Sequence, residues 1–417
     1  MRVAIITESF PPDVNGVAHC VLQVAENLVS RGHQPLVIAP RPSRGTHARA
    51  AAKDPASFGY PVVRVPSAPL PGYRGFRLGL PSHRLRDALV EHRSEIVHLA
   101  SPVVLGAHGA AVARQLSLPV VAAYQTDLPS YARAYRLGRA GEALAWRWLR
   151  GIHNGAARTL APSTVTATGL LGRGIGNVWL WGRGVDTVRF HPARRNPQAR
   201  ARLAPGGELI AGYVGRLATE KRVELLARIT ALPGLRLVIV GAGPAGATLR
   251  RYMPEALFLG ERRGDELAAI YASLDVFVHS GPYETFGQTL QEAAASGLAV
   301  VAPAAGGPLD LVDDGVTGYL VPPGDPDAFA DAVARLAADP ALRAAFGAAG
   351  RRKVLGRTWT ALTDELIGHY AAVLGWTRRP ATSSRNKEHC SEPAGEHGPF
   401  EPVRPATTAG PLHDANF

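Results

Sequence analysis

The stretch that decides the fold runs from Val276 to Glu292 and reads Val-Phe-Val-His-Ser-Gly-Pro-Tyr-Glu-Thr-Phe-Gly-Gln-Thr-Leu-Gln-Glu. A short apolar run leads into a turn at Gly281, and a helical pattern begins near Gly287. This order predicts a buried strand followed at once by a helix, the repeating unit of a parallel α/β sheet. Ligands of such sheets bind beyond the carboxyl ends of the strands, where helix N-termini present free N–H groups. We therefore expect this segment to face a ligand.

Short apolar runs that alternate with longer helical patterns occur along the chain in two sets. The first set predicts strands at 3–7, 35–39, 62–65, 96–99, 120–124, 159–161 and 178–181, and the second at 209–214, 235–240, 256–259, 276–279 and 299–302. Strands that alternate with helices in this way indicate βαβ units. The expected fold class is α/β, with two Rossmann-like domains.

Composition predicts the domain boundaries. Residues 186–207 contain three prolines and a double glycine, which suit an interdomain connection. We therefore expect an N-terminal domain over 1–185 and a C-terminal domain over 208–357. A helix over 358–376 should pack back towards the N-terminal domain. Residues 377–417 are polar and lack periodicity, so we expect them to be disordered.

Length and composition narrow the class of protein. The 417 residues are enough for two domains, and the hydrophobic content of 46% is enough for packed cores. Two cysteines are too few for a disulfide framework or a cysteine zinc site. The apolar run at the N-terminus is shorter than a signal-peptide core, and no run reaches the roughly 18 residues typical of a membrane span. These features predict a cytoplasmic protein.

The net charge of +12 is concentrated in the N-terminal half. Residues 1–185 hold 21 Lys and Arg against 9 Asp and Glu, whereas the remainder holds 25 of each. A one-sided basic surface attracts anionic partners, although an arginine-rich composition alone is the other explanation. Arginines 133, 136, 139, 147 and 150 surround Trp146 and Trp148, a mixture that suits an anionic membrane surface. The alternative is an amphipathic helix that packs on its own domain. The basic residues lack the interleaved aromatic stacking motifs that are typical of nucleic-acid-binding proteins.

Two cations follow the first strand of the second set, in the segment from Gly215 to Lys221. Arg216 offers a planar fork to phosphate oxygens and Lys221 a point charge, so the pair suits a diphosphate. The alternative is that both form surface pairs with Glu220 or Glu224, which would contribute little.

Glu284 and Glu292 lie eight residues apart, one before the predicted helix and one inside it. Together they could hold two parts of one long ligand. The alternative is a glutamate that only complements the helix dipole.

These segments, together with Ala305-Gly306-Gly307-Pro308, resemble family 4 glycosyltransferases of the GT-B fold, from residue 1 to about residue 375. The resemblance implies two domains that face each other across a cleft, with the acceptor on the N-terminal side and a nucleotide sugar on the C-terminal side. It implies that Arg216 and Lys221, with Gly215, bind the donor diphosphate, that Glu284 binds the hexose hydroxyls, that Phe286 and Gly287 bind the sugar through backbone amides, and that Glu292 binds the ribose.

The N-terminal side carries the rest of the implied site. The loop that contains Asn15 and Gly16 resembles the family loop in which a glycine admits the diphosphate and the acceptor, although a simple turn capped by Asn15 would explain it equally. Many relatives carry a histidine where this chain has Gln125. Glutamine cannot act as a base, so proton acceptance falls to Asp127 or to the donor phosphate.

The segments 124–127 and 180–186 are similar to those of bacterial GDP-mannose-dependent α-mannosyltransferases that act on glycolipids. This similarity implies retaining transfer of mannose to a lipid or glycolipid at the inner face of the plasma membrane. The alternatives are a UDP-hexose transferase with another acceptor and a nucleotide-sugar epimerase of similar shape. No metal is expected, because Asp325-Pro326-Asp327 is typical of a helix cap and the two cations would replace the charge of a metal.

Overall fold

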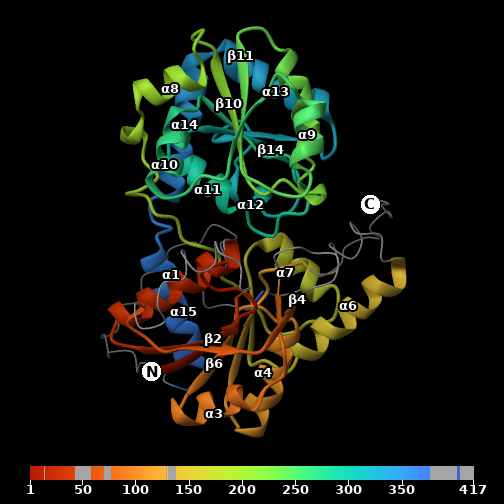
Figure 1. Ribbon diagram of the computed structural model, residues 1–417, viewed down its shortest axis with the longest axis vertical. Helices are drawn as coiled ribbons and strands as arrows, with labels where there is room; N and C mark the ends of the chain where they lie inside the picture. Colours follow the sequence, from red (N-terminus) through yellow and green to blue (C-terminus); the bar gives the residue numbers. More distant parts are fainter. Residues whose placement is uncertain are drawn as a thin grey trace, which may run out of the picture.

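The computed structural model describes residues 1–13, 15–42, 58–69, 77–127, 129, 138–375 and 402–403. These residues form two α/β domains that lie one above the other along the long axis of the molecule (Figure 1). The segment expected to be disordered lies outside the described residues except for 402–403, and Arg133 and Arg136 lie outside them as well.

Within the described residues, the N-terminal domain contains seven parallel strands in the order β3-β2-β1-β6-β7-β8-β9. Their bounds are β1 Arg2–Ile6, β2 Gln34–Pro40, β3 Val62–Val65, β6 Ile96–Leu99, β7 Val120–Ala123, β8 Arg158–Ala161 and β9 Val178–Leu180. The helices are α1 Gly16–Ser30, α3 His83–Glu91, α4 Val104–Gln115, α6 Gly138–His153 and α7 Thr164–Leu171. A separate antiparallel pair consists of β4 Ser67–Pro69 and β5 Arg77–Gly79.

The described part of the C-terminal domain contains six parallel strands in the order β12-β11-β10-β13-β14-β15. Their bounds are β10 Leu209–Val214, β11 Leu235–Val240, β12 Leu257–Gly260, β13 Val276–Val278, β14 Ala299–Pro303 and β15 Gly318–Val321. The helices are α8 Pro197–Leu203, α9 Gly246–Tyr252, α10 Gly264–Ser273, α11 Gln288–Ala295, α12 Pro308–Leu311, α13 Pro326–Ala338 and α14 Pro340–Val354, with 3-10 helices η2 Pro192–Arg194, η3 Thr219–Lys221 and η4 Val223–Ala231.

Both sheets reverse their strand order beside their first strand. Strand β1 lies between β2 and β6, and β10 lies between β11 and β13. In open α/β sheets the loops at such a reversal diverge, and ligands bind there at the carboxyl ends of the strands. The loops after β1, β10 and β13 are therefore the places where each domain can form a site.

The α/β fold with two Rossmann-like domains is confirmed. Every strand expected from the sequence is present, with each end displaced by no more than one residue. The central strands are buried on both faces, as the fully buried run of β1 from Val3 to Ile6 illustrates. Parallel strands covered by helices on both sides need continuous apolar sequence, which explains why these runs were recognisable. The short strands β4, β5 and β15 were not expected.

The chain crosses between the domains at two neighbouring places. On the outward path Trp181 is buried in the N-terminal core, whereas Val185 is already buried in the C-terminal core. On the return path Val354 belongs to the C-terminal core and Trp359 to the N-terminal core. The two crossings are joined by a hydrogen bond of 2.8 Å from the Val185 amide to the Arg357 carbonyl. Much of the segment expected to be a linker instead packs on the C-terminal domain, with Phe190 and Leu203 in its core.

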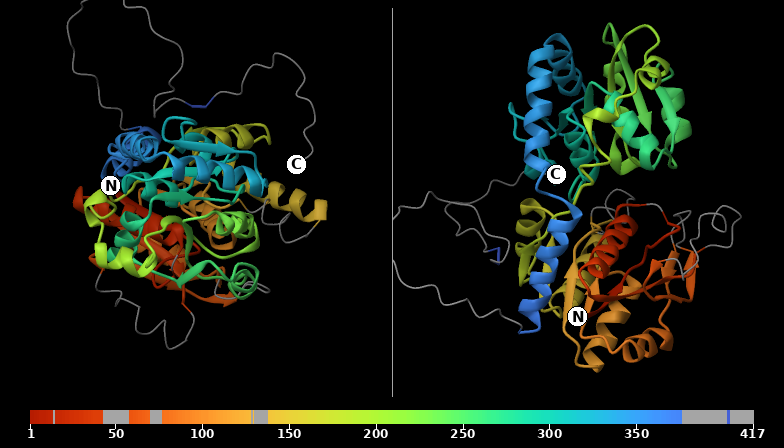
Figure 2. Two further views of the ribbon diagram at one scale, coloured as in Figure 1. Left: turned by 90° about the horizontal axis from the view of Figure 1, so that it is seen from above. Right: turned by 90° about the vertical axis from the view of Figure 1, so that its left-hand side faces the viewer.

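The last described helix, α15 (Trp359–Val373), packs on the N-terminal domain beside α1 (Figure 2, right). Leu366 and Tyr370 are fully buried in the core that α1 shares with β1 and β2. The Tyr370 hydroxyl lies 2.9 Å from Nδ1 of His98 on β6. The C-terminal domain is therefore inserted between two parts of one N-terminal core.

Candidate active site

The centre of the candidate site is an ion pair between Lys221 and Glu284. Lys221 ends η3, in the loop after β10, and Glu284 lies in the loop after β13. Because β10 and β13 are neighbours, the two loops meet, and Lys221 Nζ lies 2.6 Å from Glu284 Oε2. Their side chains are only 22% and 19% exposed. The alternative of a surface pair with Glu220 or Glu224 is wrong for Lys221; it is Arg222 that pairs with Glu224, at 2.7 Å.

The pair is charged despite its burial. Burial alone would raise the pKa of Glu284, but the Lys221 ammonium, His279 and the hydrogen bond from Lys221 together lower that pKa to about 2. Burial likewise works to lower the pKa of Lys221, and the Glu284 carboxylate outweighs it, so that this pKa is raised. A desolvated charge needs an opposite charge nearby, and each residue supplies it to the other.

His279, which directly follows β13, lies close to Glu284. Its Nε2 is 3.8 Å from Glu284 Oε2, and its ring stacks on that of Tyr213 with 6.4 Å between centroids. Burial lowers the pKa of His279 to about 4, so the ring is neutral at neutral pH. From the sequence, His279 was predicted only as the end of a strand, because its contact with Glu284 depends on the course of the loop.

Glu292 lies on α11 and contacts Tyr271 of α10. The Tyr271 hydroxyl donates a hydrogen bond of 3.0 Å to Glu292 Oε2. Burial raises the pKa of Glu292 to about 7, and hydrogen bonds from Tyr271 and Gln288 only partly oppose this effect. The carboxyl is thus oriented by its neighbours and changes charge near neutral pH.

Glycines shape the backbone around Glu284. Gly287, the N-cap of α11, has a φ of +104°, which suits glycine because a side chain there would be strained. A Cβ on Gly307 would lie 2.2 Å from the Phe286 carbonyl oxygen, and the Gly307 amide donates to the Glu284 carbonyl at 2.7 Å. The Ala305–Pro308 motif therefore holds the loop of Glu284 in place.

Arg216 and Gly215 lie in the same loop as Lys221. Arg216 is half-buried, and burial lowers the pKa of its guanidinium. A Cβ on Gly215 would lie 2.7 Å from the Tyr213 hydroxyl, and the same hydroxyl donates to the Arg216 carbonyl at 3.2 Å. The loop is fixed from below by Tyr213 and remains close to the backbone of Gly241.

On the N-terminal side, Asn15 caps α1, which was one of the two interpretations of this loop. Its Oδ1 accepts hydrogen bonds from the amides of Val17 and Ala18, at 3.1 and 3.0 Å. Gly16 follows at the start of α1, and Asp127 accepts a hydrogen bond of 3.0 Å from the Tyr124 hydroxyl.

Gln125 is buried and contacts both Cys20 and Arg183. Its amide nitrogen lies 3.6 Å from Cys20 Sγ, and its oxygen accepts a hydrogen bond of 3.2 Å from Arg183 Nη2. Arg183 was not predicted as a site residue, although its position between Gly182 and Gly184 was a signal. A Cβ on Gly184 would lie 2.4 Å from the Trp359 backbone, so this segment needs glycine to pass α15.

Contacts between the domains place the loop of Glu284 beside the N-terminal domain. The Thr164 amide on α7 donates to Asp310 Oδ2 on α12 at 2.6 Å, and the Thr166 hydroxyl donates to the Thr285 carbonyl at 3.4 Å. Gln288 donates to the Gly184 carbonyl at 3.0 Å. The loops at the carboxyl ends of the two sheets thus face each other.

The ion pair predicts how Glu284 titrates. In the wild-type protein the pKa of the Glu284 carboxyl, followed by carbon-13 NMR, should be about 2. In Lys221→Met it should rise, because burial is then opposed only by His279 and Arg183 and no longer by the ammonium. Arg222→Met is the matched control, since Arg222 pairs with Glu224. An unchanged Glu284 pKa in Lys221→Met would contradict the pairing.

Comparison with known proteins places these features in a family. The family model "Glycosyltransferase Family 4" matches residues 14–189. The family model "Glycosyl transferases group 1" matches residues 195–353. A GDP-mannose-dependent alpha-mannosyltransferase of Mycobacterium tuberculosis is 48% identical, over 90% of this chain and 97% of that protein. A protein of the same name from Corynebacterium glutamicum is 43% identical, over 91% of each chain.

Solved structures agree on the fold. Sucrose-phosphate synthase from Thermosynechococcus elongatus superposes with a TM-score of 0.73 at 22% identity, over 90% of this chain and 100% of that chain. HepE from Anabaena in complex with UDP gives a TM-score of 0.72 at 19% identity, over 89% of this chain and 100% of that chain. The epimerase alternative does not agree with the relatives that match nearly the whole chain, because these are named mannosyltransferases. The chain belongs to the family 4 glycosyltransferases and has their GT-B fold.

Proposed function

We propose that this protein transfers mannose from GDP-mannose, with retention of anomeric configuration, to a lipid or glycolipid at a membrane surface. The observation that carries the proposal is the half-buried pair of Lys221 and Glu284 at the strand-order reversal of the C-terminal sheet. Relatives that match nearly the whole chain are named GDP-mannose-dependent alpha-mannosyltransferases, which favours this donor.

The donor diphosphate would bind to Arg216, Lys221 and the N-terminus of α11. No side chain of the described residues caps this helix, so its first amides are free to donate to phosphate oxygens. The ammonium and the guanidinium add two positive charges to the same loop region. Gly215 and Gly16 would leave room for the ligand next to the backbone. These fixed charges supply the stabilisation of the leaving group for which other enzymes use a divalent ion, so we propose a metal-independent reaction.

The sugar and the nucleoside would bind to the two glutamates. The Glu284 carboxylate, ionised through Lys221, can accept hydrogen bonds from hexose hydroxyls, while the amides of Phe286 and Gly287 donate to the sugar. Glu292 would accept hydrogen bonds from the ribose, with Tyr271 holding one carboxylate oxygen in place. The eight-residue spacing thus matches a ligand with a sugar at one end and a ribose at the other.

The proposed reaction breaks the bond between the mannose C1 and the phosphate oxygen, and the electron pair leaves with GDP. The acceptor hydroxyl oxygen then forms a bond to C1 from the face that GDP has left. Its proton passes to an oxygen of the departing phosphate; Asp127, oriented by Tyr124, is the second candidate for that proton. Gln125 contributes hydrogen bonds but no base.

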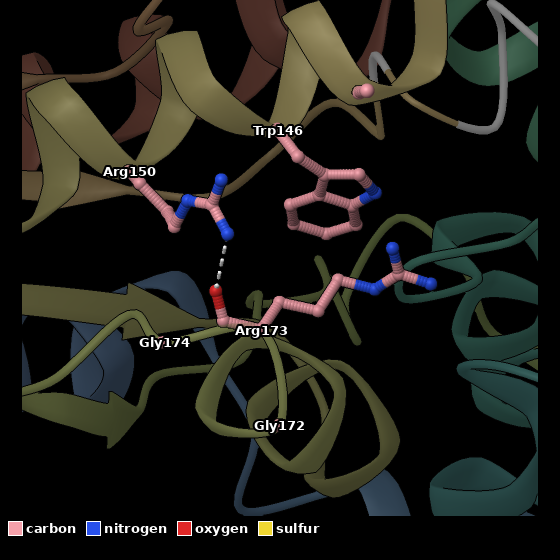
Figure 3. A pocket seen from close by; sticks show the side chains of 6 residues that line it. Trp146, Arg150, Gly172, Arg173 and Gly174 are labelled. Atoms are coloured by element: carbon pink, nitrogen blue, oxygen red, sulfur yellow. Dashed lines mark hydrogen bonds between the residues drawn. The ribbon is translucent and has the colours of Figure 1, made fainter. Parts of the chain in front are cut away.

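Helix α6 is the proposed membrane contact. Leu149 and Ile152 pack inwards, while Leu144 and Trp148 are 67% and 47% exposed among the exposed arginines 139, 147 and 150. None of the described helices has both the length and the apolar character required to cross a bilayer. An open hollow of about 660 Å³ lies beside α6, where the Arg173 guanidinium stacks 4.4 Å from the Trp146 ring and Arg150 donates to the Arg173 carbonyl (Figure 3). Basic and aromatic side chains of this kind bind anionic headgroups.

Two substitutions test the donor site. Lys221→Ala and Glu284→Ala should each lower kcat/KM for transfer by at least about 10- to 100-fold, because each removes a charge-assisted hydrogen bond of about 1.5–3 kcal/mol. Glu224→Ala, which breaks only an exposed pair, is the control and should retain activity. Circular dichroism would verify that the fold persists. Full activity in either site variant would refute the assignment.

The donor itself is tested by a screen of labelled GDP-mannose, UDP-glucose and UDP-galactose with extracted lipids. GDP-mannose should label a lipid product, and excess EDTA should leave the rate unchanged because protein cations carry the charge. Transfer only from a UDP-sugar would overturn the choice of donor, and loss of activity with EDTA that Mg²⁺ restores would overturn metal independence.

Membrane docking is tested by co-sedimentation with vesicles. Binding should require anionic lipid and weaken with salt, and Arg147→Glu, which changes the charge by two units, should reduce it roughly 30-fold, at about 1 kcal/mol for each unit. Arg251→Glu, on exposed α9 of the C-terminal domain, is the matched control. Equal binding of both variants would locate the contact elsewhere.

A further inference from the structure

Arg183 occupies the crossing between the two domains and is only 8% exposed. It follows β9, in the short segment between the buried residues Trp181 and Val185. Its guanidinium contacts Gln125 of the N-terminal domain, and its Cζ lies 6.0 Å from the ring centre of Phe286 in the C-terminal domain. One cation therefore touches both halves of the site.

This buried charge forms no ion pair within 4.0 Å in the part of the chain that the structure describes. None of the ion pairs of the described residues includes Arg183, and its hydrogen bond goes to the neutral amide of Gln125. Its Nε is buried and has no hydrogen-bond partner among the described residues. A desolvated guanidinium in this state is unfavourable unless an anion binds to it.

The guanidinium lies beside the loop of Asn15 and Gly16, where the diphosphate of the donor is expected to bind between the domains. An added Cβ on Gly16 would lie 2.8 Å from Arg183 Nη1, so glycine leaves this edge of the guanidinium uncovered. Arg183 also acts on Glu284, on the opposite side of the site. Burial raises the pKa of Glu284, whereas Lys221, His279 and Arg183 lower it. The charge is therefore close to the proposed position of the sugar and its phosphate.

We propose that Arg183 is a third donor-binding cation, whose guanidinium binds a diphosphate oxygen from the side opposite Arg216 and Lys221. Gln125 is then a positioning residue, because its oxygen orients the guanidinium without neutralising it, as a carboxylate would. Arginine suits this task since its planar fork can donate to Gln125 and to a phosphate at the same time. The inference rests on the proposed use of a nucleotide diphosphate donor.

Calorimetric titration with GDP and with guanosine, in the absence of acceptor, tests this role. Arg183→Gln should weaken GDP binding at least 10-fold and leave guanosine binding unchanged, because only GDP carries the phosphates. Arg183→Lys should bind GDP with an intermediate affinity, because lysine keeps the positive charge but lacks the planar guanidinium. Arg194→Gln, an exposed arginine of η2, removes one charge from the neighbouring segment and should bind GDP like the wild type.

Two results would overturn the proposal. Equal weakening of GDP and guanosine binding would show a general structural role for Arg183. Unchanged GDP binding in Arg183→Gln with a raised KM for the acceptor lipid would assign the guanidinium to the acceptor. Lys221→Ala is titrated in parallel to distinguish this role from the donor site itself. If both Lys221→Ala and Arg183→Gln bind GDP normally, the proposed donor site is wrong. If Lys221→Ala loses GDP binding and Arg183→Gln does not, only the role of Arg183 is wrong.

Discussion

The ion pair between Lys221 and Glu284 is the interaction on which the account of this protein depends. Two charged side chains are largely withdrawn from water at the point where the C-terminal sheet reverses its strand order, and each keeps the other ionised. Such a pair is a poor device for stability, because desolvation offsets most of the attraction. It is well suited to binding, because a phosphate and a sugar can take over the hydrogen bonds that the two residues now make to each other.

The surrounding fold holds this pair in place and brings the second domain to it. Gly306 and Gly307 let one loop pack against the backbone of Glu284, and the contact of Thr164 with Asp310 joins the domains nearby. Helix α15 returns to the N-terminal core, so that both interdomain crossings lie side by side. Arg183 lies in the outward crossing, between Trp181 and Val185.

Much of the fold was predictable from sequence because buried parallel strands must be apolar along their whole length. The run from Leu209 to Val214 illustrates this, since its bounds were predicted to the residue. The short strand β15 was missed, although Gly318–Val321 is as long as β3 and contains Tyr319 and Val321, which favour strands. The cap formed by Asn15 followed from local chemistry alone.

The site was only partly predictable, because its contacts join residues distant in sequence. Arg216, Lys221 and Glu284 were recognised by motif, but the partner of Lys221 was not, since it depends on β10 and β13 being neighbours. The contact of Arg183 with Gln125 depends on how the chain crosses between domains, which no local pattern encodes.

A crystal structure of the complex with GDP-mannose tests the central claim most directly. The diphosphate should lie against the guanidinium of Arg216, the ammonium of Lys221 and the first amides of α11, with the mannose beside Glu284 and no divalent ion between protein and phosphate. A nucleotide sugar bound elsewhere, or a diphosphate held by a metal ion, would contradict the account.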